Sequence, residues 1–153
     1  MSKPTPVPFI SEEIATQGGA WAEVIPLVTE RRKEIQELFA GVEEVIFTGC
    51  GSGLNTSLCG ASTLQMQTGI SARAVPAAEV FLFPSGVLVR GRETLAVLIS
   101  RSGKTTEVVR ALDHLHGLGV PTLGITCTAG SPLATGSDLA LVLTPLVGQA
   151  VAT

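Results

Sequence analysis

The stretch from Leu95 to Arg110 constrains the fold of this chain more than any other. It begins with an apolar run of strand length, Leu95–Ile99, and ends in the apolar spacing of an amphipathic helix. The residues between, 100–106 (Ser-Arg-Ser-Gly-Lys-Thr-Thr), are rich in hydroxyls and carry two cations. A strand joined to a helix through such a loop gathers backbone N–H groups and the positive end of a helix dipole, where a phosphate or another dianion fits. The alternative is that these hydroxyls cap the helix, as Ser and Thr commonly do.

The composition favours a buried parallel sheet, whose strands are continuous apolar runs. Hydrophobic residues make up 45% of the 153 residues and charged residues 15%, with a mean hydropathy of +0.44. The net charge of −3 and the scarcity of aromatic residues argue against a nucleic-acid-binding surface. The length suits one domain with a substantial core.

The cysteines bear on the compartment of the protein. Cys50, Cys59 and Cys127 are odd in number and form no CxxC pair. Without a secretory leader, they predict reduced thiols and a cytoplasmic protein. The Pro-rich residues 1–8 predict an extended tail rather than a signal peptide. No apolar run approaches the roughly 18 residues that cross a bilayer, so no membrane partner is expected.

Two short helices are predicted before the first strand. The first covers residues 11–17, with Ser11 as its N-cap, and Gly18-Gly19 ends it. The second opens at Pro26, because proline suits the first turn of a helix. Its apolar face consists of Val28, Ile35, Leu38 and Phe39.

Strands and helices alternate through the rest of the chain. Strands are predicted at residues 45–48, 72–75, 95–99, 122–126 and 139–143. Residues 76–83 form a short helical or irregular segment that Pro84 closes, and Ser131-Pro132 begins the last helix. This order predicts an α/β fold with a five-stranded parallel sheet and helices on both faces.

Ligand sites in such sheets lie beyond the carboxyl ends of the strands. Glycine-rich or polar loops at 49–53, 100–106 and 126–131 follow three of the predicted strands, and the second strand runs towards Glu79. These loops therefore predict one shared binding crevice.

Two nucleotide-binding patterns are incomplete, which disfavours a dinucleotide enzyme. The loop 49–53 (Gly-Cys-Gly-Ser-Gly) lacks the third glycine of G-x-G-x-x-G, and no acidic residue closes the second strand to hold a ribose. The nucleotide P-loop pattern is also absent. A small anionic ligand and no cofactor are therefore expected.

A metal site is not expected either. His114 and His116 lie two positions apart, so on a helix they do not share a face. Cys50 is interpreted as a small apolar filler, and a nucleophilic role is left open because it would need a neighbouring base.

Four segments, in this order and spacing, resemble the sugar isomerase (SIS) domain family. They are 49–53, 76–79 (Pro-Ala-Ala-Glu), 100–107 (Ser-Arg-Ser-Gly-Lys-Thr-Thr-Glu) and 126–134 (Thr-Cys-Thr-Ala-Gly-Ser-Pro-Leu-Ala). The S-x-S-G-x-T-x-E element in the third segment is the most specific. Residues 13–17 resemble the helix before the first SIS domain of tandem enzymes. These enzymes include tagatose-6-phosphate ketose/aldose isomerase-like proteins and the isomerase half of glutamine–fructose-6-phosphate aminotransferase.

The resemblance implies a flavodoxin-like sheet with a sugar phosphate bound at these loops. The hydroxyls of Ser100, Ser102 and Thr105 would hold the phosphate, Ser52 would lie near the sugar, and residues 129 and 131 would line the far side. The implied substrate-binding residues are Ser52, Ser100, Arg101, Ser102, Thr105, Ala129 and Ser131. Glu79 is either a sugar-hydroxyl ligand, and then the candidate catalytic residue, or a structural acid at a helix end. Glu107 falls in the first turn of its helix, where it suits the dipole.

The resemblance also implies how the chain is organised. Residues 1–40 are expected to be a tail with helices, and residues 41–153 a SIS domain that is truncated at its C-terminus. Isomerisation needs an acid and a base, and in the tandem enzymes the main ones come from a second SIS domain or a partner subunit. The chain is thus expected to bind sugar phosphate as part of an isomerase or an amino-sugar-phosphate deaminase/isomerase. The alternative is a non-catalytic sensing module of a regulator.

Overall fold

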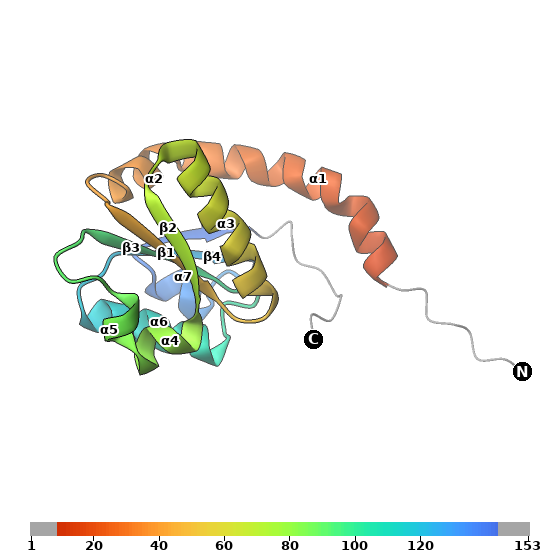
Figure 1. Cartoon of the computed structure of the whole chain (residues 1–153). Helices are drawn as coiled ribbons and strands as arrows, with labels where there is room; N and C mark the ends of the chain where they lie inside the picture. The colour runs from red at the N-terminus through yellow and green to blue at the C-terminus, as the bar shows by residue number, and fades with distance from the viewer. Residues whose placement is uncertain (1–8, 144–153) are drawn as a thin grey trace, which may run out of the picture.

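A computed structural model describes residues 9–143, with side chains from residue 14 onward. The expected tail at residues 1–8 and the segment after Leu143 lie outside the described residues. Five parallel strands form one sheet in the order β2-β1-β3-β4-β5 (Figure 1). The strands are β1 (Glu44–Gly49), β2 (Ser71–Pro76), β3 (Thr94–Ile99), β4 (Thr122–Thr126) and β5 (Leu139–Val142). The predicted α/β architecture is confirmed.

The order of the strands puts β1 and β3, which are buried along almost their whole length, inside the sheet between β2 and β4. β1 pairs with β3 from Glu44↔Thr94 to Gly49↔Ile99, so both strands end at the same level. Their side chains alternate between two cores, because successive residues of a strand point to opposite faces. Val45 contributes to one core and Ile46 to the other.

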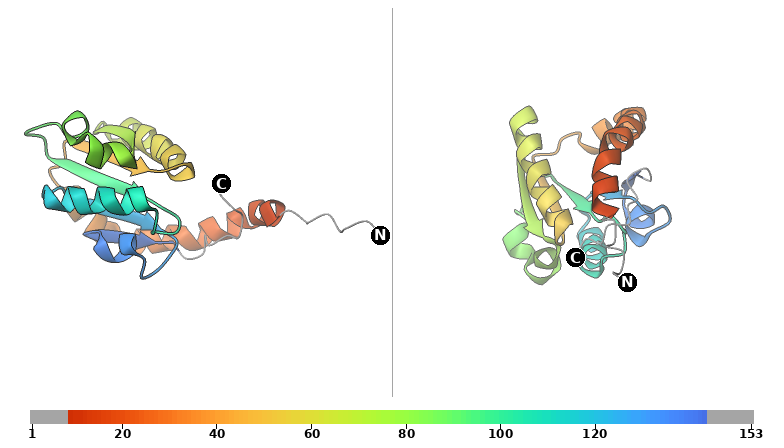
Figure 2. Two further views of the ribbon diagram at one scale, coloured as in Figure 1. Left: turned by 90° about the horizontal axis from the view of Figure 1, so that it is seen from below. Right: turned by 90° about the vertical axis from the view of Figure 1, so that its right-hand side faces the viewer.

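Helices cover both faces of the sheet (Figure 2). One core lies under α4 (Ala77–Leu82), α5 (Pro84–Val87), α6 (Thr106–Gly117) and α7 (Pro132–Gly136). The other lies under α3 (Ser52–Thr68) and the pair α1 (Phe9–Glu30) and α2 (Arg32–Leu38). The best example of helical patterning is α6, which buries Val108, Ala111, Leu112 and Leu115 on one face.

The predicted break at Gly18-Gly19 is wrong, because α1 runs without interruption from Phe9 to Glu30. Neither glycine adopts the positive φ that ends a helix, and glycine inside a helix costs only about 1 kcal/mol. Because Phe9 already belongs to α1, Ser11 is not its N-cap. Pro26 lies inside α1 rather than opening a second helix; the break comes at Arg31 instead.

The ends of the other helices follow the residue types expected at helix termini. Gly69 ends α3 in the left-handed conformation, and Ser131 caps α7 by accepting a hydrogen bond from the amide of Ala134. Residues 76–83, predicted as a short helical or irregular segment closed by Pro84, contain the helix α4, and Pro84 then opens α5, which was not predicted from the sequence.

Candidate functional site

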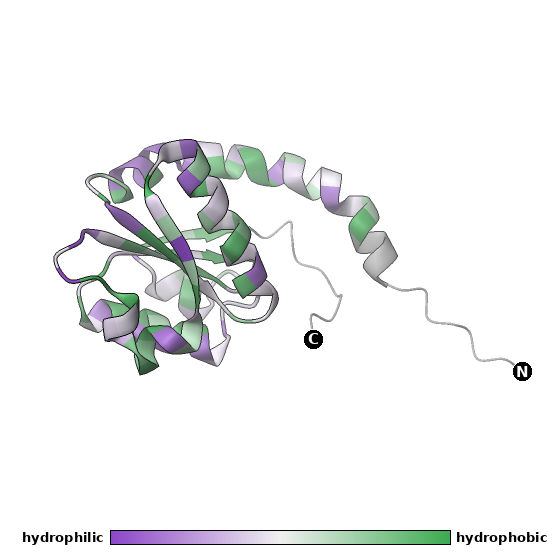
Figure 3. Cartoon of the chain, in the orientation of Figure 1, coloured by the Kyte–Doolittle hydropathy of each residue, from purple (hydrophilic) through white to green (hydrophobic). Residues whose placement is uncertain are grey.

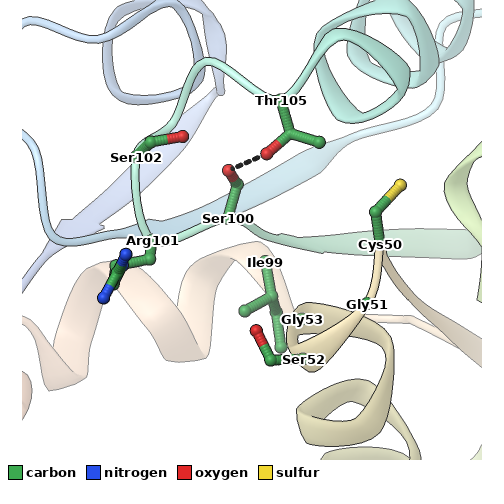
Figure 4. Close-up of a pocket in the computed structure, with 9 residues that line it drawn as sticks. All are labelled: Cys50, Gly51, Ser52, Gly53, Ile99, Ser100, Arg101, Ser102 and Thr105. Carbon is green, nitrogen blue, oxygen red and sulfur yellow. Dashed lines mark hydrogen bonds between the residues drawn. The ribbon is translucent and has the colours of Figure 1, made fainter. Parts of the chain in front are cut away.

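A pocket of about 280 Å³ lies at the carboxyl ends of β1 and β3. It is lined by Cys50, Gly51, Ser52, Gly53, Ile99, Ser100, Arg101, Ser102 and Thr105 (Figure 4). Five of these were predicted from the sequence as substrate-binding residues. They meet because β1 and β3 are hydrogen-bonded neighbours whose ends coincide at Gly49 and Ile99.

The first wall of the pocket is the connection from β1 to α3. A Cβ atom at Gly53 would lie 2.8 Å from the carbonyl oxygen of Ile99, so only glycine lets α3 begin this close to β3. The N-cap residue Gly51 provides no side-chain cap. The amino end of α3 therefore faces the pocket, and the Ser52 hydroxyl lies on the side towards Ile99 (Figure 4).

The second wall is the loop from β3 to α6, which its own hydroxyls hold in shape. The Ser100 and Thr105 hydroxyls lie 2.8 Å apart, and Ser100 Oγ also accepts a hydrogen bond from the Gly103 amide at 3.1 Å. Ser102 Oγ accepts one from the Lys104 amide at 3.2 Å. Thr105 stands at the N-cap position of α6 but makes no side-chain cap. These hydroxyls thus stabilise the loop instead of capping the helix.

The electrostatics of the pocket favour an anion. Two helices, α3 and α6, begin at the pocket without side-chain caps, so their positive dipole ends are directed to it. The amides of Gly53 and Leu54 in the first turn of α3 already donate to the carbonyls of Cys50 and Gly51. Arg101 is the only charged residue among those that line the pocket. The arrangement offers hydroxyl, amide and guanidinium donors, which are the groups that bind phosphate.

Cys50 brings a thiol into the same pocket. Burial raises the pKa of this thiol, the negative charge of Glu107 raises it further, and a hydrogen bond with the backbone of Ala77 acts in the opposite direction. The raised pKa keeps the sulfur protonated near neutral pH, which does not favour a nucleophile.

Three predicted site residues are not among those lining the pocket. Ser131 is fully buried and caps α7, and Ala129 is exposed in the connection from β4 to α7. Glu79 is exposed in the first turn of α4. That turn lies close behind the pocket, since Ala77 at its start is hydrogen-bonded to Cys50.

Four lining residues were not assigned to the site from the sequence: Cys50, Gly51, Gly53 and Ile99. Three of them adjoin a predicted site residue in sequence and Cys50 lies two positions before Ser52, and that proximity was the available signal. Their contribution is backbone or packing, which residue type alone does not indicate.

No three His, Cys, Asp or Glu side chains between residues 14 and 143 gather into a possible metal site. His116 instead lies 3.1 Å from the Thr122 hydroxyl and 3.8 Å from the Asp138 carboxylate. Within residues 9–143, no helix combines the length and apolar character needed to span a membrane.

Residues 38–147 match the SIS domain family, so the chain belongs to this family. It is 30% identical over 137 residues to the isomerizing glutamine–fructose-6-phosphate aminotransferase of Aeropyrum pernix. The aligned region covers 88% of this chain and 22% of that protein. The chain thus spans about a fifth of the length of this relative.

Two solved structures show the same fold. Tagatose-6-phosphate ketose/aldose isomerase from Escherichia coli has a TM-score of 0.78 and 24% identity, covering 93% of this chain and 41% of that one. The C-terminal domain of glucosamine-fructose-6-phosphate aminotransferase from Francisella tularensis has a TM-score of 0.80 and 20% identity, covering 97% and 43%.

Proposed function

We propose that the chain binds a hexose phosphate or amino-hexose phosphate through its phosphate group in the pocket between β1 and β3. The observation that carries the proposal is the meeting of two uncapped helix N-termini with hydroxyls and one guanidinium. The exposed Ser102 and Arg101 are the side chains best placed to bind phosphate directly. Ser100 and Thr105 supply the shape of the loop and donors at its base.

The sugar would extend from the phosphate past Ser52. Ala129 and Ser131 remain proposed neighbours of the sugar on the far side, through the β4–α7 connection rather than through the buried Ser131 hydroxyl. Glu79 remains the proposed carboxylate of this chain, because the first turn of α4 stands next to Cys50.

We propose that the chain acts as part of an aldose–ketose isomerase or an amino-sugar-phosphate deaminase/isomerase. Such chemistry needs a base to move a proton between adjacent carbons and an acid to open the sugar ring. No carboxylate or imidazole is among the nine described residues that line the pocket. The main acid and base would come from a second SIS domain or from a partner subunit, and the setting would be the cytoplasm.

Isothermal titration calorimetry on the full chain tests the binding proposal. Fructose 6-phosphate and glucosamine 6-phosphate should bind, whereas fructose, glucosamine and NAD should not. The expected loss for Arg101→Ala is at least about tenfold in affinity, since a charge-assisted hydrogen bond is removed. Ser102→Ala should weaken binding by a smaller factor.

The matched control is Lys104→Ala, which removes the same charge from the same loop but outside the residues that line the pocket. Its effect should stay below about threefold, the size of a long-range charge effect at physiological salt. Equal losses for the two variants would show a diffuse electrostatic effect and contradict the proposed site. Turnover of fructose 6-phosphate by the chain alone would contradict the assignment of the acid and base to another domain.

A further inference from the structure

The connection from β4 to α7 holds the loop that carries Arg101 and Ser102, although it contributes none of the nine described residues that line the pocket. The backbone carbonyl of Arg101 accepts three hydrogen bonds from this connection. The donors are the Thr126 hydroxyl at 3.1 Å, the Cys127 amide at 3.0 Å and the Thr128 hydroxyl at 3.4 Å. The position of Arg101 therefore depends on the end of β4.

Thr126 is the buried side chain among these donors. It is the last residue of β4 and is 1% exposed, in a sheet built largely of hydrophobic residues (Figure 3). Its hydroxyl accepts a hydrogen bond from the Thr128 amide at 3.2 Å, and its single proton goes to the Arg101 carbonyl. The contact of the Thr128 hydroxyl is longer and exposed to solvent. Thr126 is therefore the side chain that fixes the Arg101 carbonyl.

Fixing this carbonyl also fixes the direction of the Ser102 amide. The two groups belong to one trans peptide unit, in which C=O and N–H point in opposite directions. The three donors lie on the β4 side of β3, and β1 lies on the other side. The Ser102 N–H is thus turned away from β4, towards the side where residues 50–53 complete the pocket. Within residues 9–143 this amide makes no hydrogen bond, so it can donate to a ligand.

The loop is held a second time just after Ser102. The Gly103 carbonyl accepts a hydrogen bond at 3.1 Å from the amide of Leu133 in α7. The Gly103 amide donates to Ser100, to its carbonyl at 3.0 Å and its hydroxyl at 3.1 Å. Loss of the first attachment would therefore loosen the peptide unit between residues 101 and 102 while the rest of the loop stays in place.

We propose that Thr126 is a positioning residue for the phosphate site: its buried hydroxyl fixes the Arg101 carbonyl and thereby directs the Ser102 amide at the phosphate. Thr126 itself does not touch the ligand. The inference rests on the proposed function, because it takes the phosphate to bind in the pocket between β1 and β3. It adds the end of β4 to the structures on which that site depends.

Calorimetry on the full chain with fructose 6-phosphate and glucosamine 6-phosphate tests this role. Thr126→Val keeps the shape of the side chain but removes the hydroxyl. It should weaken binding about tenfold, the lower end for loss of a hydrogen bond to a charged group. The factor should be the same for both ligands, because both present the same phosphate. Thr126→Ser restores the hydroxyl and should bind within about twofold of the wild type.

The matched control is Thr122→Val, at the other end of the same strand. Thr122 is also fully buried, and its hydroxyl donates to the Asp138 carboxylate at 2.6 Å. Four residues of a strand separate it from Thr126 by about 13 Å. Both variants should lower the urea midpoint, but Thr122→Val should bind fructose 6-phosphate like the wild type. If Thr126→Val does not fold, Thr126→Ala takes its place, because it leaves more room beside Gly103.

A measurement without ligand separates this inference from the proposed function. The NMR order parameter of the Ser102 amide should be about 0.85 in the wild type and in Thr122→Val, as in rigid backbone, and should fall below about 0.6 in Thr126→Val. A Ser102 amide that is equally rigid in Thr126→Val and the wild type would overturn the inference.

Three binding results would overturn it as well. Unchanged affinity in a folded Thr126→Val chain would mean that the hydroxyl does not position the site. A loss in Thr126→Ser as large as in Thr126→Val would mean that the hydroxyl is not the cause, and an equal loss in Thr122→Val would mean general destabilisation. A wild-type chain that binds neither sugar phosphate would refute the proposed function and with it the phosphate role of Thr126, whereas the order parameter would still show whether Thr126 holds the Ser102 amide.

Discussion

Gly103 provides the sharpest test of how the loop between β3 and α6 is built. This residue is buried and has a φ of +63°, in the left-handed region. A Cβ atom placed on it would lie 2.0 Å from Ser131 Oγ, 2.6 Å from Ser131 Cβ and 2.8 Å from Thr126 Oγ1. The substitution Gly103→Ala therefore adds backbone strain and forces the buried cap of α7 to move.

The size of the effect follows from these two causes. A left-handed conformation costs a non-glycine residue about 1–2 kcal/mol, and overpacking of a buried site costs about 1–3 kcal/mol. The alanine variant also has a lower conformational entropy in its unfolded chain, which offsets about 0.4–1 kcal/mol of this destabilisation. Gly103→Ala should thus lower the free energy of unfolding by about 3 kcal/mol. Gly119→Ala is the matched control, because its φ is +70° but a Cβ atom there would have no neighbour within 4 Å.

Urea denaturation, followed by circular dichroism, measures the difference between the two variants. Gly119→Ala should cost only about 1 kcal/mol, from strain alone. The double variant Gly103→Ala/Ser131→Gly should recover much of the loss, since glycine at an N-cap costs only a few tenths of a kcal/mol. If Gly103→Ala and Gly119→Ala agreed within about 0.5 kcal/mol, near the accuracy of such comparisons, the steric explanation would be refuted.

Three further predictions concern charged and reactive groups. Asp138→Asn should cost about 1 kcal/mol at pH 7. Burial raises the pKa of the Asp138 carboxyl, but hydrogen bonds from the hydroxyl and amide at the start of β4 outweigh it and leave the pKa lowered. This stabilisation is present above the unfolded pKa of about 3.9 and is lost as the pH falls through the lower folded pKa, so urea midpoints of wild type and variant should converge in acid. Arg73→Met should lower the free energy of unfolding by about 3 kcal/mol, because it leaves the Glu44 carboxylate buried without its partner, which lies 3.1 Å away. Adding Glu44→Gln to the same chain should recover part of that stability. An unchanged urea midpoint for Arg73→Met would contradict the pairing. Cys50, whose pKa is raised by burial and by a nearby carboxylate, should react with iodoacetamide at pH 7 more slowly than the exposed thiol on α3, as peptide mass spectrometry would show.

The architecture of the domain could be derived from the sequence because its signals are local. Apolar runs of strand length alternate with helical spacing, and parallel strands must then share one carboxyl edge. These signals alone predict that Ser52 and residues 100–105 lie at one site. It worked because β1 and β3 are adjacent strands whose ends coincide.

Long-range packing decided what the sequence did not show. Ser131 has the residue type of a ligand, but its hydroxyl caps α7 in the fully buried space beside Gly103. Whether a hydroxyl faces a ligand or the backbone depends on which neighbours surround it, and residue type alone does not contain that information.

The sequence by itself therefore determined the class of fold and the edge of the sheet where a ligand would bind, because periodicity and loop composition are properties of neighbouring residues. Only the tertiary structure decided which hydroxyls line the pocket and that the amino ends of α3 and α6 meet there. It also decided that the end of β4 holds the loop between β3 and α6. These outcomes depend on contacts between residues far apart in the chain, and such contacts exist only once the sheet has formed.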